Sequence, residues 1–426
     1  MSTALLTDRY ELTMLSAALR DGTAGRHCVF EVFARKLPPG RRYGVVAGTG
    51  RLVEAIADFR FGEAELDHLR EQGVVDADTA DWLARYRFTG DIYGYAEGEL
   101  YYPGSPILTV TGTFAECVLL ETLVLSILNY DSAVAAAAAR MVTAARGRPI
   151  IEMGSRRAHE QAAVAAARAA YLAGFASTSN LEAGRRYGVP TAGTAAHAFT
   201  LLHDSESAAF ASQVAALGKS TTLLVDTYDI AEGIRRAVAT AGPGLAAIRI
   251  DSGDLSVLAQ QSRQQLDSLG AVDTKIIVSG DLDEYAIAAL AAEPVDAYGA
   301  GTSVVTGSGA PTAGLVYKLV EVDGAPVVKR SEHKATIGGR KTAVRRHKPT
   351  GTATEEVVVS RGRPEPAPHD RMLQRPYLIR GEPVPDLPDL AASRELLREG
   401  LVAVPWEGLK LSAGDPAIPV TMLAGD

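Results

Sequence analysis

The stretch LAAIRIDSGDLSVLAQQSRQQLDSLGAVDTKIIVSG, residues 245–280, decides the fold class of this sequence. It begins and ends with short runs of apolar and β-branched residues, LAAIRID (245–251) and TKIIVSG (274–280), which are typical of buried strands. Between them, LSVLAQQSRQQLDSL (255–269) has a helical pattern. A strand, a helix and a strand at this spacing predict two parallel strands joined by a right-handed crossover.

The same alternation extends through the middle of the chain. Further strands are expected at PIIEM (149–153), VPTAG (189–193), TTLLVD (221–226) and VDAYG (295–299). Alanine-rich helical stretches separate them, such as HEQAAVAAARAAYLA (159–173) and IAEGIRRAVATA (230–241). Because several such units follow one another, the pattern favours a closed or partly closed α/β barrel over an open sheet.

The two ends of the chain have a different pattern. FEVFARK (30–36) and YGVVAGT (43–49) predict strands, and residues 90–112 predict hairpins of an antiparallel sheet. Strand patterns return at residues 313–330, where Asp323-Gly324 is a hairpin-turn signal. The predicted fold class is therefore α/β, an irregular (β/α) barrel with a flanking α+β sheet domain built from N-terminal and C-terminal segments.

Three regions follow from these patterns. Residues 1–115 form the N-terminal sheet domain, which is completed by about residues 313–360, and residues 116–312 form the barrel that carries the chemistry. Residues 361–426 are interpreted as a proline-rich linker and C-terminal tail without chemistry, containing one short helix at 393–400.

Composition excludes several classes of protein. The chain is 47% hydrophobic and 22% charged, as in globular proteins, and its net charge of −8 without a basic block predicts no nucleic-acid partner. Two cysteines make a disulfide framework improbable. The N-terminus lacks the pattern of a signal peptide, and the most apolar run, VLLETLVLSIL (118–128), is shorter than a membrane span. We expect a soluble, cytoplasmic protein without a membrane partner.

Polar residues occur where barrel enzymes place their active sites. Glu152, Asp226, Asp251, Ser279 and Gly299 lie at or near the carboxyl ends of predicted strands. Asp and Ser at such positions also cap the following helix, so each polar residue alone has a structural alternative. Together they favour a site at this face of the barrel.

Two motifs add charge and phosphate-binding potential to this face. In RIDSGD (249–254), Arg249 and Asp251 can project to one side, either as parts of a site or as a salt bridge. In GAGTSVVTGSG (299–309), glycines let backbone N–H groups approach a phosphate, with Gly301 and Thr302 as the candidate contacts.

A basic segment follows in EHKATIGGRKTAVRR (332–346). One interpretation is a solvated hairpin edge that its charges protect from association. The other is a polyphosphate clamp, in which arginine gives bidentate contacts and lysine a point charge. The candidate phosphate ligands are Lys334, Arg340 and Lys341.

His197 has an unusual sequence context in GTAAHAF (193–199). Its neighbours are glycine, threonine and alanine, and no acid or cysteine stands beside it as a metal site would require. Such small neighbours leave space for a bulky group to approach the imidazole ring.

The motifs of this chain, in the order in which they occur, resemble those of nicotinate phosphoribosyltransferases over residues 5 to about 346. They are TDRYELTM (7–14), FEVFARK (30–36), EMGSRRAHE (152–160), FASTSNLEAG (175–184), GTAAHAF (193–199), LLVDTYDIAEG (223–233), IRIDSGD (248–254) and GAGTSVVTG (299–307). The resemblance implies a type II phosphoribosyltransferase fold, a homodimer, and a role in NAD biosynthesis. The implied reaction joins nicotinate to phosphoribosyl pyrophosphate, with ATP as coupled substrate and Mg²⁺ as metal.

The resemblance also assigns catalytic roles. His197 matches the histidine that ATP phosphorylates in this family. Asp251 resembles the acid near the ribose, where it can stabilise an oxocarbenium-like transition state. Asp226 is a second acid candidate that acts through Mg²⁺, so that Asp226 and Asp251 are the candidate metal ligands.

The remaining matches concern the substrates. Tyr10 matches a tyrosine that stacks on the pyridine ring across the dimer interface, and Met153 stands where many relatives carry an aromatic residue. The implied ligands of the carboxylate and ribose phosphate are Arg249, Thr194 and Arg156, and those of the 5′-phosphate are Gly301 and Thr302. Ser179 aligns with the acid that selects an amide in nicotinamide-specific relatives, so an uncharged serine favours nicotinate.

Three alternatives stay open at this point. One is a nicotinamide-specific phosphoribosyltransferase, another is a decarboxylating quinolinate-type enzyme, and the third is a barrel that serves as a non-catalytic module. The joint presence of His197, Arg249, Asp251, Gly301 and Thr302 argues against the last.

Overall fold

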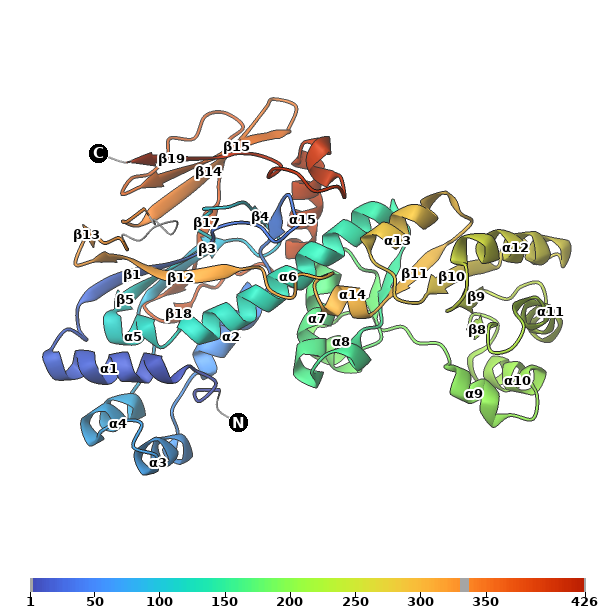
Figure 1. Cartoon of the computed structure of the whole chain (residues 1–426), viewed down its shortest axis with the longest axis horizontal. Coiled ribbons are helices and arrows are strands. Elements are labelled where there is room, and N and C mark those ends of the chain that lie inside the picture. Colours follow the sequence, from blue (N-terminus) through green and yellow to red (C-terminus); the bar gives the residue numbers. More distant parts are fainter. Residues whose placement is uncertain (1–2, 330–336, 425–426) are drawn as a thin grey trace. The chain divides into compact units, whose positions relative to one another are not determined.

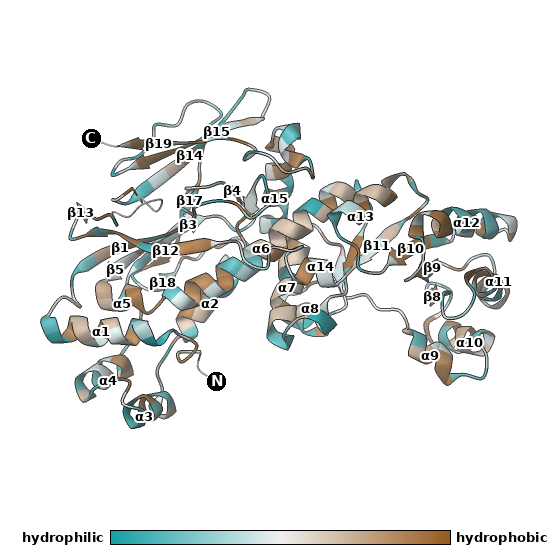
Figure 2. Cartoon of the chain, in the orientation of Figure 1, coloured by the Kyte–Doolittle hydropathy of each residue, from teal (hydrophilic) through white to brown (hydrophobic). Residues whose placement is uncertain are grey.

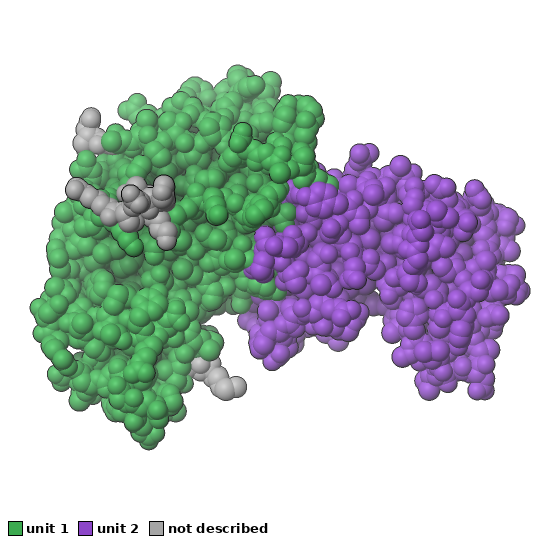
Figure 3. All heavy atoms as spheres, in the orientation of Figure 1, with its two compact units in different colours: residues 1–136, 312–426 green, residues 137–311 purple. Residues whose placement is uncertain are grey.

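The computed structural model describes residues 3–329 and 337–424, and its chain is divided into two compact units (Figures 1 and 3). Unit 1 consists of Met1–Ala136 and Thr312–Asp426, and unit 2 is the continuous segment Ala137–Pro311. The basic segment at 332–346 falls partly outside the described residues, and Lys334 is among those outside.

Unit 2 is built on a six-stranded parallel sheet with the order β7-β6-β11-β10-β9-β8. Its strands are β6 (Ile150–Glu152), β7 (Ser177–Thr178), β8 (Thr222–Leu224), β9 (Ala247–Ile250), β10 (Lys275–Ser279) and β11 (Ala297–Ala300). The helices that alternate with them include α7 (Glu160–Leu172), α11 (Ile230–Ala241), α12 (Leu255–Ser268) and α13 (Glu284–Ala289). The sheet is a parallel half-barrel, which confirms the prediction of parallel strands joined by helical crossovers.

The helix boundaries in unit 2 follow from side-chain caps. Asp229 accepts a hydrogen bond from the Glu232 N–H at the start of α11, and Asp254 accepts one from Val257 N–H at the start of α12. Asp254, the last residue of RIDSGD, therefore caps the helix that follows this motif. Figure 2 shows apolar residues on the strands and hydrophilic residues on outer helices such as α12.

One predicted strand of unit 2 is wrong. Residues 189–193 form no strand, and their pairing is an isolated bridge between Thr191 and Thr178. The physical reason is Pro190, which has no backbone N–H to donate to a ladder and instead accepts a hydrogen bond from Thr178 N–H.

Unit 1 contains a seven-stranded antiparallel sheet with the order β13-β12-β1-β5-β3-β17-β18. Its strands are β1 (His27–Ala34), β3 (Asp91–Tyr95), β5 (Leu108–Thr113), β12 (Leu315–Val322), β13 (Ala325–Pro326), β17 (Gln374–Ile379) and β18 (Glu382–Pro383). Asp323 and Gly324, with φ of 47° and 76°, make the predicted hairpin turn between β12 and β13. Both chain ends thus contribute to one sheet.

Two smaller sheets complete the strands of unit 1. A four-stranded sheet has the order β16-β14-β15-β19, with β14 (Lys341–His347), β15 (Ala353–Ser360), β16 (Arg371–Met372) and β19 (Val420–Ala424). A two-stranded sheet joins β2 (Gly44–Val45) to β4 (Leu100–Tyr101). The predicted strand at 43–49 is therefore shorter than expected: β2 ends at Val45, and helix α2 (Thr49–Asp58) begins at the last predicted residue. The tail at 361–426 contributes strands to the two larger sheets and the helix α15 (Leu390–Ala403).

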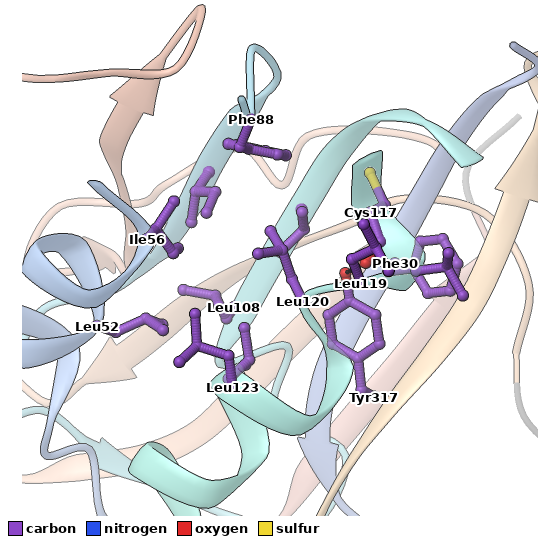
Figure 4. Packing of buried hydrophobic residues seen from close by; sticks show 14 of the residues in the cluster. Phe30, Leu52, Ile56, Phe88, Leu108, Cys117, Leu119, Leu120, Leu123 and Tyr317 are labelled. Atoms are coloured by element: carbon purple, nitrogen blue, oxygen red, sulfur yellow. Dashed lines mark hydrogen bonds between the residues drawn. The ribbon is translucent and has the colours of Figure 1, made fainter. Parts of the chain in front are cut away.

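The main core of unit 1 lies between its large sheet and the helices α5 (Phe114–Val118) and α6 (Glu121–Ala145) (Figure 4). Phe30 and Tyr317 stack with ring centroids 4.8 Å apart, and the Tyr317 hydroxyl donates a hydrogen bond to the Cys117 carbonyl over 2.8 Å. In the described part of the chain, the helical stretch Phe114–Ala145 is long and apolar enough to cross a membrane. Its most apolar window is 67% buried, as in the core helix of a globular protein.

Candidate active site

His197 is the first residue of helix α9 (His197–Leu202) in unit 2. Its Nδ1 lies 3.2 Å from Oγ1 of Thr227, within hydrogen-bonding range, and its Nε2 lies 3.8 Å from Oδ1 of Asp226. The imidazole is 40% exposed, whereas the Asp226 side chain is 1% exposed. The acid that the local sequence lacks is therefore supplied by the segment after β8, beside an imidazole that solvent reaches.

Asp226 is held firmly through one of its two oxygens. Its Oδ2 accepts hydrogen bonds from the Asp251 N–H over 2.9 Å and from the Ser252 hydroxyl over 2.8 Å. Its Oδ1 is buried and accepts no hydrogen bond from the described residues. Parallel pairing of β8 with β9 brings these two strand ends together. One carboxylate oxygen is thus anchored while the other is left for a ligand or for His197.

Arg249 and Asp251 bind different neighbours. Arg249 Nη1 donates a hydrogen bond to Thr194 Oγ1 over 2.5 Å, and its buried Nε has no partner among the described residues. The Ser279 hydroxyl donates to Asp251 Oδ1. Arg249 and Asp251 therefore do not form a simple salt bridge with each other.

The surroundings of Arg249 have opposing effects on its pKa. Burial lowers the pKa of Arg249 below its ordinary value, although Asp251 and Asp226 act in the opposite direction, and Arg156 adds repulsion. Guanidinium groups stay protonated in proteins all the same. A desolvated cation with an unpartnered N–H is suited to binding an anion such as a carboxylate.

Glu152, at the end of β6, holds together two segments that carry predicted substrate contacts. It is 1% exposed, and it accepts hydrogen bonds from the Gly154 N–H and, over 2.5 Å, from the Thr178 hydroxyl. Its carbonyl accepts the Ser179 N–H over 2.8 Å. Burial raises the pKa of this carboxyl, although the Thr178 and Gly154 hydrogen bonds oppose the shift. Met153 and Ser179 are thereby fixed side by side.

The glycine-rich segment after β11 is packed against Met153. Met153 N–H donates to the Ala300 carbonyl over 2.8 Å, and a Cβ on Gly299 would lie 2.9 Å from the Met153 sulfur. Gly301 precedes the short helix α14 (Thr302–Val305), and the Thr302 hydroxyl donates to Asp281 Oδ1 over 3.3 Å. The absence of side chains here makes room for Met153 and leaves Thr302 at the strand end where the sequence places a phosphate contact.

The other predicted ligands belong to unit 1. Tyr10 lies in α1 (Arg9–Asp21) and is 44% exposed, and partial burial together with Glu121 raises its pKa. Arg340 is exposed, with its guanidinium 4.9 Å from the centroid of the Tyr93 ring. Lys341 is buried, and its Nζ donates a hydrogen bond to Glu31 Oε2 over 2.7 Å. The ammonium group of Lys341 is therefore committed to an ion pair inside unit 1.

Thr227 and Ser279 contact the predicted site residues without having been assigned a role from the sequence. Thr227 stands next to Asp226 in the motif at 223–233, and Ser279 ends a predicted strand. The place of Thr227 in the motif and the place of Ser279 at a strand end are the signals that could have indicated them. Their contacts depend on which strands are neighbours, which the sequence does not reveal.

Two models of known protein families match the chain. The N-terminal domain of nicotinate phosphoribosyltransferases matches residues 5–129, and the nicotinate phosphoribosyltransferase family itself matches residues 149–350. The chain belongs to this family. The family resemblance of the motifs is thereby confirmed.

Individual relatives of the nicotinate phosphoribosyltransferase family agree with this assignment. The nicotinate phosphoribosyltransferase pncB1 of Mycobacterium tuberculosis is 65% identical over 425 residues, which cover 97% of this chain and 94% of that protein. The crystal structure of human nicotinic acid phosphoribosyltransferase has a TM-score of 0.85 and 28% identity, covering 98% of this chain and 97% of that one. The predicted fold class is confirmed by this likeness.

A further solved structure shares the fold. The nicotinate-nucleotide pyrophosphorylase of Pyrococcus furiosus has a TM-score of 0.79 and 25% identity, covering 94% of this chain and 95% of that one. The fold is thus shared by proteins with different names, so the choice of reaction depends on the site residues.

Proposed function

We propose that this chain is an ATP-coupled nicotinate phosphoribosyltransferase, which makes nicotinate mononucleotide and pyrophosphate from nicotinate and phosphoribosyl pyrophosphate. Membership of the family supports the transfer reaction. The observation that supports ATP coupling is that His197, Asp226 and Arg249 lie together at the ends of β8 and β9. There, Asp226 Oδ1 and Arg249 Nε have no partner among the described residues. Such unpartnered buried atoms are suited to ligands that the chain itself does not supply.

In the transfer step, the ring nitrogen of nicotinate forms a bond to the anomeric carbon of the ribose. The bond from that carbon to pyrophosphate breaks, and its electron pair leaves with the pyrophosphate. Positive charge develops on the ribose in an oxocarbenium-like transition state, as in glycoside chemistry. Asp251, whose carboxylate is fixed by Ser279, stabilises that charge and accepts a hydrogen bond from a ribose hydroxyl.

Nicotinate is held by its carboxylate and by its ring. Arg249 supplies the cation, Thr194 orients it through the 2.5 Å hydrogen bond, and Arg156 adds positive charge close by. Ser179 places no negative charge near the carboxylate, which favours nicotinate over its amide. Met153 packs on one face of the ring through its thioether. We further propose that Tyr10 of a second copy stacks on the other face in a homodimer.

The phosphate groups meet backbone and arginine donors. Gly301 and Thr302 bind the 5′-phosphate at the end of β11, and the exposed Arg340 contacts a polyphosphate group. The expected contact from Lys341 is left out of this proposal because the lysine is buried and paired with Glu31. The expected contact from Lys334 lies outside the described residues.

Magnesium fits the donors at this site. Mg²⁺ prefers oxygen ligands, and proteins usually supply one or two carboxylates while substrate phosphates and water supply the rest. Asp226, with its unpartnered Oδ1, and Asp251 would hold the ion. The described residues contain no cluster of three or more His, Cys, Asp or Glu that could hold a metal without a substrate. When bound with pyrophosphate, the ion would neutralise charge on the leaving group.

ATP is coupled to the synthesis through His197. A ring nitrogen of His197 forms a bond to the γ-phosphorus while the bond from that phosphorus to the bridging oxygen breaks, and ADP leaves with the electron pair. The phosphoryl group is later transferred to water. The half-exposed ring allows ATP to approach the imidazole. We further propose that this reaction takes place in the cytoplasm.

The deciding experiment is labelling with ATP carrying a radioactive γ-phosphate. We expect an acid-labile, base-stable label on the wild-type protein and none on His197→Ala, which retains slow transfer without ATP. Equal labelling of both proteins would refute the assignment of His197. Because a quinolinate-type enzyme needs no phosphohistidine, an unlabelled wild-type protein that consumes quinolinate would favour that reaction.

A further inference from the structure

The segment after β8 presents two consecutive side chains to the two nitrogens of His197. Asp226 Oδ1 lies 3.8 Å from Nε2, which is too long for a hydrogen bond. Thr227 Oγ1 lies 3.2 Å from Nδ1, which is within hydrogen-bonding range. Thr227 is therefore the side chain that contacts the imidazole directly in this state of the protein.

The ring needs such a contact to keep one orientation. It is 40% exposed, and its neighbours in the chain, Ala195, Ala196 and Ala198, have no side chain beyond Cβ to pack along it. A hydroxyl can donate or accept a hydrogen bond, so Thr227 can hold Nδ1 whichever way the proton of the imidazole is placed. The contact thus orients the ring without fixing the protonation state of the imidazole.

Thr227 itself is held in place by the anchored residue before it. Asp226 Oδ2 is fixed by the Asp251 N–H and the Ser252 hydroxyl, and the Val225 N–H donates to the Arg249 carbonyl over 3.2 Å. Just beyond Thr227, Asp229 caps α11, which fixes the other end of the short connection. The hydroxyl of Thr227 is therefore a preorganised group between two fixed points.

We propose that Thr227 is a positioning residue for the phosphorylation of His197: its hydroxyl holds Nδ1 and so fixes the rotation of the ring toward ATP. This inference rests on the proposed ATP coupling through His197. Thr227 does not itself take part in bond making between nicotinate and ribose. Its loss affects the coupling to ATP and leaves the transfer itself intact.

The test compares Thr227→Val, which removes the hydroxyl at nearly constant volume, with Thr227→Ser, which retains it. Misplacing a reacting group by about 1 Å costs roughly 10²-fold in rate. We expect Thr227→Val to slow labelling of His197 by roughly 10- to 100-fold and to lower the ATP consumed per mononucleotide. Slow transfer without ATP should be unchanged, and Thr227→Ser should restore the labelling. Thr222→Val, on β8, is the matched control for a lost hydroxyl.

A second measurement is independent of activity. In protein labelled with ¹⁵N-histidine, the Nδ1 resonance of His197 should move in Thr227→Val and stay near its wild-type position in Thr227→Ser. Unchanged labelling in Thr227→Val, an unmoved resonance, or an equal loss of coupled and ATP-independent transfer would each overturn the inference. If the wild-type protein is not labelled by ATP, the proposed coupling fails, and the resonance still decides whether Thr227 holds the ring.

Discussion

Arg249 and Asp251 lie two positions apart at the end of β9, and each is held by a residue from another segment. Thr194 orients the guanidinium, and Ser279, at the end of β10, orients the carboxylate. In the proposed reaction, the two charges have separate functions. One is available for an anionic substrate and the other for a developing cation.

Arg249→Lys is expected to raise the KM for nicotinate about 10- to 100-fold with a smaller effect on kcat. Lysine keeps the charge but lacks the planar fork, and a hydrogen bond between charged groups contributes roughly 1.5–3 kcal/mol. Steady-state kinetics measure the effect, and melting curves serve as the control. A variant that melts much earlier but binds nicotinate normally would contradict the assignment.

Asp251→Asn is expected to lower kcat by about 10²-fold with little change in melting temperature. The amide keeps the shape and the contact to Ser279 but loses the negative charge that opposes the oxocarbenium. Single-turnover transfer without ATP isolates this step from phosphorylation. Near-normal turnover in the folded variant would assign Asp251 to structure instead.

At the scale of elements, the approach of α11 to β8 depends on one glycine. A Cβ on Gly233 would lie 2.3 Å from the carbonyl oxygen of Val225. Backbone atoms cannot move aside as the tip of a side chain can. The helix that follows Asp226 and Thr227 is therefore held close to the strand that precedes them.

Gly233→Ala should destabilise unit 2 even though alanine is the better helix former. Alanine in a helix gains up to about 1 kcal/mol over glycine, whereas overpacking costs about 1–3 kcal/mol, and here the opposing atom is backbone. We expect a lower melting temperature and slower labelling of His197. Gly244→Ala is the control, because a Cβ there meets no atom within 4 Å. Equal melting of the two variants would show that α11 shifts freely.

The elements of unit 2 were predictable where hydrophobic periodicity was long and regular. The helix at 230–241 begins and ends as the sequence predicts, and the strand run at 274–280 contains β10. The strand expected at 189–193 does not form, because Pro190 has no backbone N–H to donate to the ladder. The contacts of Thr227 and Ser279 were not predictable, since they depend on the neighbours of β8, β9 and β10 in the sheet. The family motifs identified the residues of the candidate site, but not their hydrogen-bond partners.

At the scale of the whole molecule, unit 1 is joined across its two chain segments by a buried arginine. Arg345 on β14 forms ion pairs with Glu99 and, over 2.7 Å, with Glu356, and it donates to the Leu100 carbonyl over 2.8 Å. Burial raises the pKa of Glu99, but Arg345 and Arg371 outweigh it, so that the net pKa lies below the ordinary value. The basic segment at 332–346, interpreted as either a solvated hairpin edge or a polyphosphate clamp, thus contains a core residue.

Arg345→Met should destabilise unit 1 by about 3–5 kcal/mol at neutral pH, because it leaves the buried Glu356 without a cation and leaves Glu99 paired with Arg371 alone. In the wild type, Glu99 contributes stability above its unfolded pKa and loses it as the pH falls through its folded pKa. Protonation of the buried carboxylates removes the unpaired charge in the variant. The difference in unfolding free energy between the wild type and Arg345→Met should therefore narrow toward pH 4. Denaturant unfolding between pH 4 and 8 measures it. Arg346→Met is the control and should cost at most about 1 kcal/mol, because Arg346 is half-exposed and pairs with the partly exposed Glu355 and, over 4.0 Å, with Asp370.

The split of unit 1 between the two ends of the chain has a consequence during synthesis. On the ribosome, β1, β3 and the strand β5 that pairs with both of them emerge first, but the partners of their outer edges, β12 and β17, are made after all of unit 2. Until then, the nascent strands expose unpaired edges, which are templates for association with other chains. Unit 2 is continuous and can fold as soon as it leaves the exit tunnel. A message broken after Pro311 would therefore release a chain whose unit 2 is complete, while its first strands remain open to aggregation and to chaperones.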